Sequence, residues 1–428
     1  MSVADVLYLV HRLPFPPNKG DKLRSYHLLS ELAARHRVHL GTFIDDAGDE
    51  AHVPAVQAMC ASMHVERIPG RAGVRAGAVA LACGLPISVA HYRSGRMASW
   101  VRRTVREQAI TNAVVFSAAM GQFVTRLRTV RVLADFVDVD SDKWAQYARS
   151  RRWPTSALYR REAATLLEFE NALATRAARS FFVTEQESAL FRRLVPTAAA
   201  RVETVENGVD AAYFDPAVRH ATPFADDEIP IVMTGAMDYW PNVDAATWFA
   251  ANVLPSLRAA WPRARFYVVG MRPAAAVRAL AGAHVVVTGS VADVRPYLAH
   301  AAVAVAPLRI ARGIQNKVLE AMAAGRPVVA SSTCAAALRA TPDRELMVAA
   351  DAAGFVDAIG RLLRDGALAA RVGAAARAAV LARYDWRRNL ARISQCVDAP
   401  PALGLDGDDV DLARGVDAHR AAPVREAP

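Results

Sequence analysis

Residues 312–330 read RGIQNKVLEAMAAGRPVVA and carry the most specific pattern in the chain. The pattern predicts a glycine-led turn, a short helix that carries Lys317 and Glu320, a stop at Gly325 and then a buried strand. The start of a helix offers unpaired backbone N–H groups and a partial positive charge, which suit a phosphate group. A carboxylate one turn further along is well placed to hold ribose or sugar hydroxyls. The stretch therefore predicts one αβ unit with the parts that grip a nucleotide-sugar.

The alternation of short apolar runs and helical patterns extends along most of the chain. The expected strands lie near residues 5–10, 38–43, 63–68, 113–116, 130–136 and 180–183, and then near 231–234, 265–269, 285–288, 303–306 and 328–330. Strands that alternate with helices predict parallel sheets covered on both faces. With 428 residues, the chain has room for about two or three domains. We therefore expect the α/β class with two Rossmann-like domains. Within the first domain, Thr184 followed by Glu187 predicts a capping box at a helix start.

Turn signals and composition divide the chain into domains. Asn207-Gly208 marks a turn near the start of the second half. We expect a first domain over residues 1–205, a second over residues 206–380, and a final helix over residues 381–397. Residues 398–428 are acidic, rich in Pro, Gly and Ala, and without periodicity, which predicts a disordered tail.

The stretch at 312–330 resembles the donor-binding motif of the retaining glycosyltransferases of family 4, which have the GT-B fold. The residues that match the second half of that motif are Glu320, Ala321, Gly325, Pro327, Val328 and Val329. The resemblance implies two Rossmann-like domains whose parallel sheets face each other across a cleft, with the donor held by the second domain. The first glutamate of the motif would fall at position 312, where this chain has Arg312. Arg312 could clamp the diphosphate of the donor, or it could be a solvated loop residue.

Two longer sequence segments resemble one subgroup of this family. PPNKGDKLRSYHLLSELA, residues 16–33, and ARGIQNKVLEAMAAGRPVV, residues 311–329, are similar to sugar transferases found beside exosortase/PEP-CTERM and exopolysaccharide gene clusters. The similarity implies a retaining hexosyltransferase that acts on a glycan or lipid-linked acceptor in bacterial exopolysaccharide or envelope glycan synthesis. It also implies a nucleotide-diphosphate sugar as donor and no metal or other cofactor. The helix at 381–397 resembles the final helix of the family, which crosses back onto the first domain.

The resemblance also places donor contacts along the second domain. Many members hold the diphosphate with an Arg and a Lys in the turn after the first strand of this domain, but the corresponding phrase TGAMDYWPNVDA has no cation. A diphosphate in a partly buried site needs cations or helix ends, so Lys317, Arg312 or Arg309 is expected to serve. Backbone groups after the strand at 285–288 would read the nucleotide base. The expected donor contacts in this domain are Gly235, Gly289, Ser290, Arg309, Gly313, Asn316, Lys317 and Glu320.

The loop after the first strand is a second candidate binding segment. It contains Asn18, Lys19, Gly20 and Lys22, and it lies at the carboxyl end of the expected sheet, where ligands bind in open α/β folds. Lys19, Gly20 and Lys22 could meet the donor phosphates or the acceptor. A purely structural loop is the alternative.

A cluster of acids follows the expected strand at 130–136. Asp135, Asp138, Asp140 and Asp142 fall within DFVDVDSDKW, and such a cluster could bind a divalent ion. Because the resemblance implies a metal-independent reaction, we expect no metal and assign Asp138 or Asp140 to acceptor or donor hydroxyls. Helix capping by Asp140 or Ser141 is the alternative. The candidate catalytic residues are Glu320, Lys317, Arg312 and Asp138.

The formal charge of +10 is partly concentrated in residues 67–106. This segment has no acid and eight arginines, namely Arg67, Arg71, Arg75, Arg93, Arg96, Arg102, Arg103 and Arg106, around the apolar run at 76–90. Basic residues beside an apolar face suit peripheral contact with an anionic membrane. The alternative is a genome that favours Arg, with the apolar run buried between helices. No nucleic-acid-binding module accompanies the charge, so a nucleic acid partner is not expected.

The remaining features bear on location. There is no stretch of about 20 apolar residues that would span a membrane, and the N-terminus reads as a strand and not as a signal peptide. The four cysteines are far apart in sequence and form no metal-like pair. We expect a reduced, cytoplasmic protein, held at the inner face of the cytoplasmic membrane if the basic segment docks there.

Three other functions fit parts of the sequence. A sugar-nucleotide epimerase with the GT-B fold would convert the donor without any acceptor. A non-catalytic protein that binds nucleotide-sugar or glycan is suggested by the missing first glutamate. A dinucleotide-dependent oxidoreductase is disfavoured because no Gly-x-Gly-x-x-Gly follows the first strand.

Overall fold

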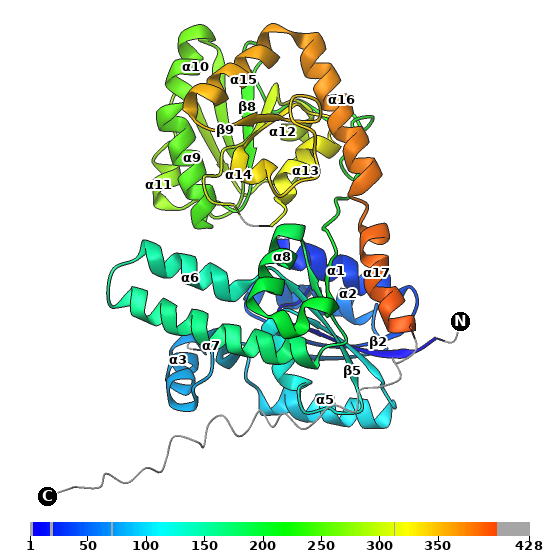
Figure 1. Cartoon of the computed structure of the whole chain (residues 1–428). Helices are drawn as coiled ribbons and strands as arrows, with labels where there is room; N and C mark the ends of the chain where they lie inside the picture. Colours follow the sequence, from blue (N-terminus) through cyan, green and yellow to red (C-terminus); the bar gives the residue numbers. More distant parts are fainter. Residues whose placement is uncertain (1–2, 18–19, 70–71, 312, 400–428) are drawn as a thin grey trace, which may run out of the picture. The chain divides into compact units, whose positions relative to one another are not determined.

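The structure is a computed structural model that describes residues 3–17, 20–69, 72–311 and 313–399. The chain divides into two compact units (Figure 1). Unit 1 comprises Met1–Thr204 and Ala391–Pro428, and unit 2 comprises Val205–Leu390. Arg312, which was expected to contact the donor, lies outside the described residues, as do Lys19 and the expected tail from residue 400 onward.

Unit 1 is built on a parallel sheet whose described part has seven strands in the order β3-β2-β1-β4-β5-β6-β7. The strands are β1 Asp5–Val10, β2 Arg37–Ile44, β3 Ser62–Arg67, β4 Asn112–Phe116, β5 Arg131–Val137, β6 Arg179–Phe182 and β7 Val202–Thr204. The strand order reverses between β1 and β4. In open α/β sheets, ligands bind beyond the carboxyl ends of the strands at such a reversal.

Helices pack on the sheet of unit 1 and bury its central strands β1, β4 and β5, which are apolar almost throughout. In β1, for example, every residue after Asp5 is buried. The helices are α1 Gly20–Ala33, α2 Val53–Gln57, α3 Ala72–Cys83, α4 Ile87–His91, α5 Gly95–Glu107, α6 Asp140–Ser150, α7 Thr155–Arg176 and α8 Glu185–Leu194, with the short 3₁₀ helices η1 Ala47–His52, η2 Ala118–Phe123 and η3 Pro196–Arg201. The boundary between the two units at Leu390 falls within α17, Trp386–Asp398.

Unit 2 is built on a second parallel sheet, which has six strands within the described residues in the order β10-β9-β8-β11-β12-β13. The strands are β8 Ile229–Thr234, β9 Ala264–Val269, β10 Val285–Gly289, β11 Val303–Ala306, β12 Val328–Ser331 and β13 Met347–Ala349. Here the order reverses between β8 and β11. The two parallel sheets confirm the predicted α/β class.

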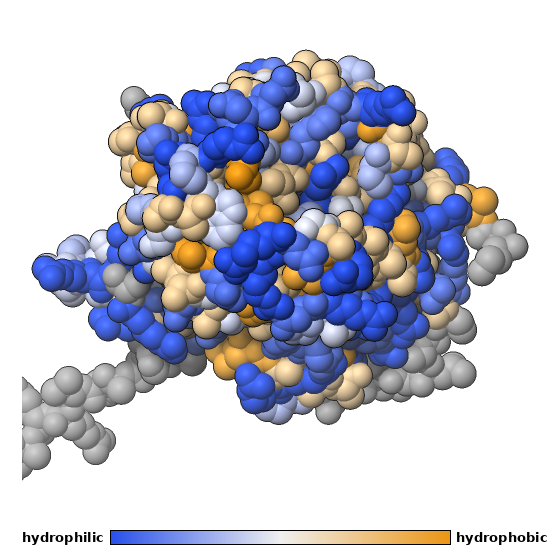
Figure 2. All heavy atoms as spheres, turned by 90° about the horizontal axis from the view of Figure 1, so that it is seen from above, coloured by the Kyte–Doolittle hydropathy of each residue, from blue (hydrophilic) through white to orange (hydrophobic). Residues whose placement is uncertain are grey.

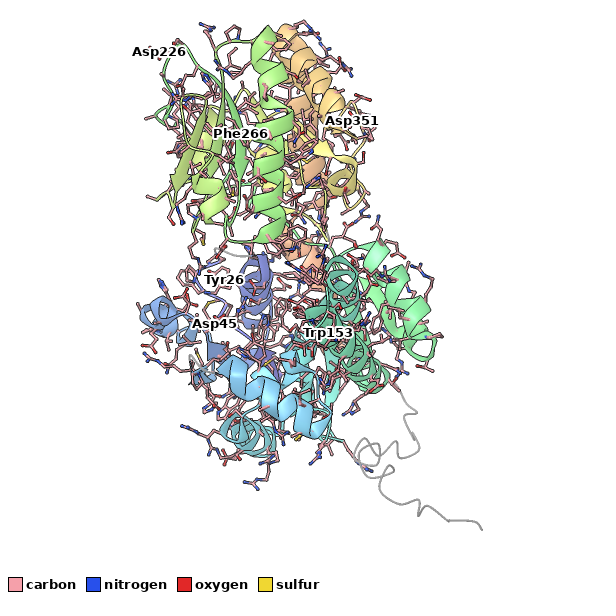
Figure 3. All side chains as sticks on the ribbon, turned by 90° about the vertical axis from the view of Figure 1, so that its left-hand side faces the viewer. Tyr26, Asp45, Trp153, Asp226, Phe266 and Asp351 are labelled. Carbon is pink, nitrogen blue, oxygen red and sulfur yellow. The ribbon has the colours of Figure 1, made fainter. Side chains whose placement is uncertain are left out.

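Helices lie on both faces of the sheet of unit 2 (Figure 1), and Phe266 of β9 lies in the buried layer between sheet and helices (Figure 3). They are α9 Trp240–Asn252, α10 Leu254–Ala260, α11 Ala275–Arg278, α12 Arg295–Ala299, α13 Asn316–Ala323, α14 Ser332–Ala335, α15 Ala352–Arg364 and α16 Gly366–Arg383. The connection from α13 to β12 is close to α16, because a Cβ at Gly373 of α16 would lie 2.2 Å from the carbonyl oxygen of Gly325. Gly325 itself has φ +67°, a conformation that favours glycine at a helix stop.

The face shown in Figure 2 is dominated by hydrophilic residues, with apolar residues in small separate groups. Within the described parts of the chain, none of the helices has the length and hydropathy that a membrane span requires.

Candidate functional site

The first turn of α13 carries the polar residues that the sequence singled out. Lys317 and Glu320 are three residues apart, so they lie on the same side of the helix. Both are half-buried, whereas the apolar residues of α13 are fully buried against the sheet; these are Val318, Leu319, Ala321 and Met322. The apolar residues therefore anchor the helix and leave its polar side at the strand ends.

The Lys317 ammonium group lies beside the turn that follows β8. Its Nζ donates a hydrogen bond to the amide oxygen of Asn242 in α9, and the amide nitrogen of Asn242 donates to the carbonyl of Ala236 at 2.8 Å. Gly235 has φ +149°, and a Cβ there would lie 2.9 Å from Asn242 Nδ2 and 3.1 Å from Lys317 Nζ. Only glycine allows this close approach of the turn to the two side chains.

Burial shifts the protonation of both candidate residues toward their neutral forms. Burial lowers the pKa of Lys317 to about 8, against the opposing charges of Cys334 and Glu320. Burial also raises the pKa of Glu320 to about 7, against the opposing charge of Lys317. Within the part of the chain that the structure describes, Lys317 forms no ion pair with a carboxylate. An incoming anion would therefore meet a cation that no carboxylate has yet neutralised.

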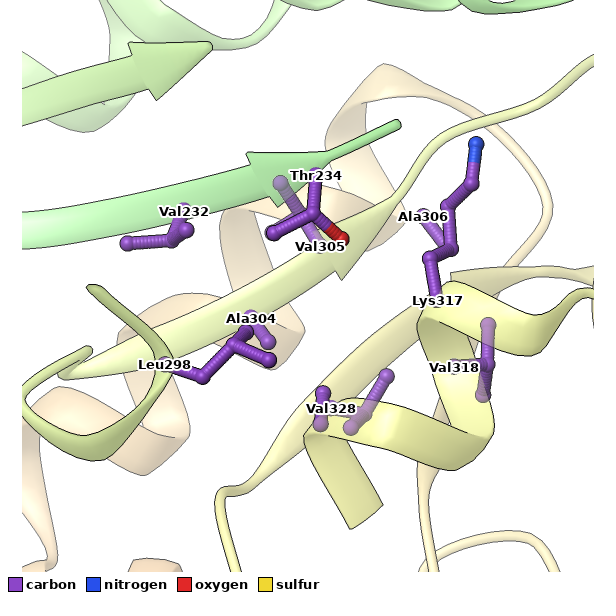
Figure 4. Close-up of a pocket in the computed structure, with 10 residues that line it drawn as sticks. Val232, Thr234, Leu298, Ala304, Val305, Ala306, Lys317, Val318 and Val328 are labelled. Atoms are coloured by element: carbon purple, nitrogen blue, oxygen red, sulfur yellow. The ribbon is translucent and has the colours of Figure 1, made fainter. Parts of the chain in front are cut away.

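A small cavity lies between β8, β11 and α13 (Figure 4). Its volume is about 10 Å³, which is room for about one water molecule and too little for a sugar. Apart from Thr234 and the stem of Lys317, its lining is apolar; it consists of Val232, Leu298, Ala304, Val305, Ala306, Val318, Ala321 and Val328. In Figure 4 the amino nitrogen of Lys317 lies away from this lining, beside the carboxyl end of β11. The cavity is therefore part of the hydrophobic core, whereas the Lys317 amine lies at the carboxyl ends of the strands.

Of the other expected donor contacts, Gly313 and Arg309 lie on the segment before α13, and Asn316 is the first residue of that helix. Gly313 is buried and has φ +60°, and the amide oxygen of Asn316 accepts a hydrogen bond from Asn207 Nδ2 at 3.4 Å. Arg309 pairs with Asp244 of α9, and 55% of its side chain is exposed. The structure thus brings Gly235, Asn316, Lys317 and Glu320 to the start of α13, whereas the Arg309 guanidinium is engaged by a carboxylate.

The loop after β10 leads to a polar cluster that sequence reasoning missed. Gly289 ends β10 with φ +68°, and Ser290 is exposed. Further along, the Arg295 guanidinium lies 4.0 Å from the ring centre of Tyr213, and the Tyr213 hydroxyl is 3.5 Å from Asp293 Oδ1. Burial and the Asp293 charge raise the pKa of Tyr213, and the Glu320 charge adds to this rise. Tyr213 therefore links the Glu320 region to this loop, although no motif in the sequence marks it.

Arg272 is a second residue that the sequence did not reveal. It follows β9 with φ +50°, and its Nε lies 3.4 Å from Asp238 in the turn after β8. The sequence of that turn has no cation, and the fold supplies one from the neighbouring loop. Only the adjacency of β8 and β9 could have identified it.

In unit 1, the residues expected to bind phosphate have different positions. Gly20 is exposed at the first residue of α1. Lys22 is only 1% exposed, and its ammonium group forms an ion pair with Asp49 at 2.5 Å. The Lys22 charge is therefore neutralised inside unit 1, as expected for the structural alternative.

The four acids after β5 do not act as a group. Asp135 is fully buried and binds Arg24 of α1 through two hydrogen bonds of 2.8 and 3.0 Å. Asp138 is half-buried and follows Val137, whose φ of +72° is unusual for a β-branched residue. Asp140 and Asp142 lie in the first turn of α6. Among the described residues, no three His, Cys, Asp or Glu side chains are placed to hold a metal ion.

The start of α6 is capped by another helix. α6 begins at Asp140, and neither Asp140 nor Ser141 caps it. Instead, Glu170 of α7 accepts hydrogen bonds from the backbone N–H and the hydroxyl of Ser141 at 3.2 and 2.5 Å. Burial raises the pKa of Glu170 to about 8 despite these bonds.

Comparison with known proteins adds to this geometry. Residues 228–365, which include most of the sheet of unit 2 and the whole of α13, match the protein family described as Glycosyl transferases group 1. No curated protein matches the chain in a sequence comparison.

Several solved structures share the whole arrangement. Anabaena HepE in complex with UDP and glucose has a TM-score of 0.66 and 14% sequence identity, and the match covers 92% of this chain and 99% of that chain. Sucrose-phosphate synthase from Thermosynechococcus elongatus has a TM-score of 0.66 and 19% identity, covering 92% and 98%. WaaG, a glycosyltransferase involved in lipopolysaccharide biosynthesis, has a TM-score of 0.62 and 17% identity, covering 92% and 100%. The expected GT-B fold, with two Rossmann-like domains, is confirmed. Together, the comparisons show the GT-B fold and, over residues 228–365, similarity to the family described as Glycosyl transferases group 1.

Proposed function

We propose that the protein is a metal-independent hexosyltransferase of glycosyltransferase family 4. It transfers a sugar from a nucleotide-diphosphate sugar to a glycan or lipid-linked acceptor, with retention of the anomeric configuration. The observation that carries the proposal is the pair Lys317 and Glu320 on α13, inside the region that matches the group 1 family. The similarity of the phrases at 16–33 and 311–329 to transferases of exosortase/PEP-CTERM systems supports a role in exopolysaccharide or envelope glycan synthesis.

The donor binds at the carboxyl edge of the sheet of unit 2. The backbone N–H groups at the start of α13 and the Lys317 ammonium group hold the diphosphate. Glu320, one turn along α13, accepts hydrogen bonds from ribose or sugar hydroxyls. Gly289 and Ser290 bind the base through their backbone groups.

The proposed reaction depends on stabilising the charges that develop as the donor bond breaks. As the bond between the sugar and the diphosphate breaks, negative charge grows on the leaving diphosphate and positive charge on the sugar ring. The cation on α13 stabilises the former, and a partly buried site strengthens that effect. In a retaining reaction the leaving phosphate can take the acceptor proton on the same face, so no separate base is needed. Asp138 of unit 1 holds an acceptor or donor hydroxyl.

The ligands bound in the similar structures guide the choice of donor. HepE was solved with UDP, with UDP-glucose, and with UDP and glucose. UDP-sugars are therefore the first donors to test for this chain. UDP, GDP, ADP, TDP and their sugars should be screened by thermal shift and saturation-transfer NMR without metal. Selective stabilisation by one nucleotide family would support the donor site, and no shift with any nucleotide would contradict it.

Turnover separates the proposal from its alternatives. The Glu320→Ala variant should lose transfer to acceptor, and activity that survives the change would contradict the role of Glu320. An epimerase would convert the donor without any acceptor. A binding protein would bind the nucleotide-sugar and release it unchanged. Glu185→Ala, at the exposed start of α8 in unit 1, is a matched control that should leave activity intact.

The basic segment of unit 1 supports peripheral contact with an anionic membrane, at the inner face of the cytoplasmic membrane. The exposed arginines in and before α5 are Arg93, Arg96, Arg102, Arg103 and Arg106, while Met97, Trp100 and Val101 are buried. Leu81 of α3 is 63% exposed. Cosedimentation with phosphatidylglycerol vesicles, compared with phosphatidylcholine vesicles, tests the contact. Binding that depends on the anionic lipid and falls when the five arginines become Gln supports it, and equal binding to both lipids contradicts it.

A further inference from the structure

Unit 1 contains a polar cluster at the point where its strand order reverses. His11 and Arg12 directly follow β1, Asp45 directly follows β2, and Ser117 directly follows β4. Figure 3 labels Asp45 at this position. Because β2, β1 and β4 are adjacent and parallel, these residues share the carboxyl edge of one sheet. This edge is where open α/β folds bind their ligands, and residues 228–365 of the family match do not include it.

Ion pairs and hydrogen bonds join the cluster. His11 Nε2 lies 3.4 Å from Oδ2 of Asp21, in the first turn of α1. Arg12 donates from Nη1 to the same oxygen at 2.7 Å, and its Nε lies 2.6 Å from Asp45. On the other side of the His11 ring, Nδ1 lies 3.5 Å from the Ser117 hydroxyl. Asp21, His11 and Ser117 thus form a chain of three groups, and Arg12 is held between two carboxylates.

Aromatic rings fix the orientation of His11. Its ring stacks on Phe116 at 5.7 Å with an interplanar angle of 4°, and it meets the edge of Tyr92 at 5.6 Å. The Arg12 charge also acts on Tyr92, on whose other side His91 lies 4.9 Å away. The imidazole therefore has a defined plane, with one nitrogen toward Asp21 and the other toward Ser117.

Charge decides which nitrogen of His11 carries the proton. Burial alone would raise the pKa of Asp21, but its hydrogen bonds with His11 and Arg12 and the charge of Arg12 outweigh burial and hold that pKa well below its usual range. Asp21 is therefore an ionised acceptor, which favours the tautomer with the proton on Nε2. Nδ1 then presents a lone pair. At 3.5 Å, the Ser117 hydroxyl is too far away to satisfy it well.

A second set of the same three residue types shows what a structural arrangement looks like. At the amino end of the same sheet, His39 lies 2.7 Å from Asp5 through Nε2 and 2.7 Å from Ser62 through Nδ1. Its side chain is 3% exposed, whereas that of His11 is 14% exposed. Both nitrogens of His39 are satisfied, at an edge where ligands do not bind. Both contacts of His11 are longer, 3.4 Å to Asp21 and 3.5 Å to Ser117, at the edge where they do.

We propose that His11 Nδ1 is the group that accepts a hydrogen bond from a hydroxyl of the carbohydrate acceptor. The Ser117 hydroxyl donates to the oxygen of that same acceptor hydroxyl. Asp21, Arg12 and Asp45 are positioning residues that hold the tautomer and plane of the imidazole. The inference rests on the proposed glycosyltransferase function and adds the class of ligand bound by unit 1, a sugar hydroxyl. Because Nδ1 only accepts a hydrogen bond, the acceptor proton still leaves with the donor phosphate.

The test measures acceptor binding and donor binding separately on the full chain. A panel of free disaccharides and octyl glycosides is the acceptor probe for saturation-transfer NMR, and the nucleotides of the donor screen are the second probe. His11→Ala should weaken glycoside binding about tenfold, the loss expected for a hydrogen bond to a buried site. Its nucleotide affinity should stay within about twofold of wild type. His11→Asn, whose amide oxygen can replace Nδ1, should restore part of the glycoside affinity.

His39→Asn is the matched control. It removes the same ring from the same sheet, so it should lower the melting temperature while leaving glycoside affinity unchanged. A wild-type protein that binds none of the glycosides, or a His11→Ala variant that binds them normally, would overturn the inference. Loss of nucleotide binding in wild type would instead contradict the glycosyltransferase proposal itself, so the two failures are distinguishable.

The positioning role of Asp21 has its own readout. Long-range ¹H–¹⁵N spectra should show His11 with its proton on Nε2 in the wild-type protein. In Asp21→Asn, the population should move toward the other tautomer, and glycoside affinity should fall with it. An unchanged His11 spectrum in Asp21→Asn would contradict the positioning role, because a change in fold stability alone does not exchange tautomers.

Discussion

Two lysines lie at helix starts, one in each unit, and have opposite surroundings. Lys22 lies in the first turn of α1, which follows β1, and Lys317 lies in the first turn of α13, which follows β11. Lys22 is buried in an ion pair with Asp49, whereas Lys317 contacts the neutral amide of Asn242. A lysine at a helix start is therefore a phosphate candidate only where no carboxylate has already paired with it. The sequence around the two lysines does not reveal this difference, because both partners come from other elements.

The two helices are also held in place by different forces. α1 buries Leu28, Leu29 and Leu32 and is also tied to its unit by two buried charge pairs, Lys22 with Asp49 and Arg24 with Asp135. α13 is held by apolar residues, and its polar side is left for other contacts. The same αβ architecture thus uses charge for stability in unit 1 and keeps charge available in unit 2.

The largest expected effect is on stability, from Lys22→Met. The change leaves Asp49 buried without its cation, which should cost about 3–5 kcal/mol of unfolding free energy. Urea unfolding followed by circular dichroism measures it. Nucleotide affinity of the folded variant should stay within about twofold of wild type. A stable variant that has lost nucleotide binding would show that Lys22, and not only Lys317, contacts phosphate.

Lys317→Met should have the opposite profile. Removal of a charge-assisted contact should weaken nucleotide-diphosphate binding by about 2–3 kcal/mol, which is roughly 30–150-fold. Since burial lowers the pKa of Lys317 to about 8, the folded state binds this proton less tightly than the unfolded chain. The free energy of unfolding at neutral pH should therefore rise or stay constant.

Calorimetry with the best nucleotide from the screen measures the loss in Lys317→Met. Lys143→Met on α6 of unit 1 provides the control, because it removes a helix lysine elsewhere. Equal nucleotide affinity of the Lys317→Met and Lys143→Met variants would contradict the proposed difference between the helix starts of α1 and α13.

Gly235→Ala tests the close approach of the turn after β8 to Lys317. A methyl group would meet Asn242 and the Lys317 amine, and φ +149° disfavours a side chain. A cost of about 1–3 kcal/mol is expected, shared between stability and nucleotide affinity. Gly77→Ala in α3, where a Cβ meets no atom within 4 Å, should be neutral. If both variants behave alike, the turn is less constrained than the geometry indicates.

The change in nucleotide-sugar affinity with pH should be the smallest of these effects, expressed per pH unit. In the unliganded protein Lys317 loses its proton above pH 8 and Glu320 gains one below pH 7, following their pKa values of about 8 and about 7. Affinity for a nucleotide-sugar should be greatest between these values and fall toward about tenfold per pH unit outside them. Lys317→Arg should remove the alkaline limb, and Glu320→Gln the acid limb. A flat profile from about pH 6 to about pH 9.5 would contradict the assignment.

Much of the architecture could be read from the sequence because it depends on local patterns. The apolar runs predicted most strands of both sheets, since a strand buried on both faces must be apolar throughout. They missed the short strands β7 and β13, which have three residues each. The pattern of residues 312–330 predicted α13, its stop at Gly325 and the strand β12. Those features need only the residues themselves and their neighbours in sequence.

The partners of charged groups could not be read in this way. Asp135 looked like part of an acidic cluster, yet it pairs with Arg24, 111 residues away. The turn after β8 looked short of cations, yet Arg272 reaches it from the loop after β9. No sequence pattern marked His11, because Asp21 and Ser117 come close to it only when α1 and β4 pack beside β1.

The helix start at Thr184 contains one contact that the sequence predicted and one that it did not. Thr184 accepts a hydrogen bond from the Glu187 N–H at 3.2 Å, as the capping box predicted. The Glu187 carboxylate, however, accepts a bond of 2.7 Å from the backbone N–H of Val139, after β5. The sequence by itself determined most of the strands and the helix start proposed to receive a phosphate, because these follow from short-range sterics and burial. The tertiary structure alone decided which charges are neutralised and which remain available, because electrostatic partners are set by distance in space.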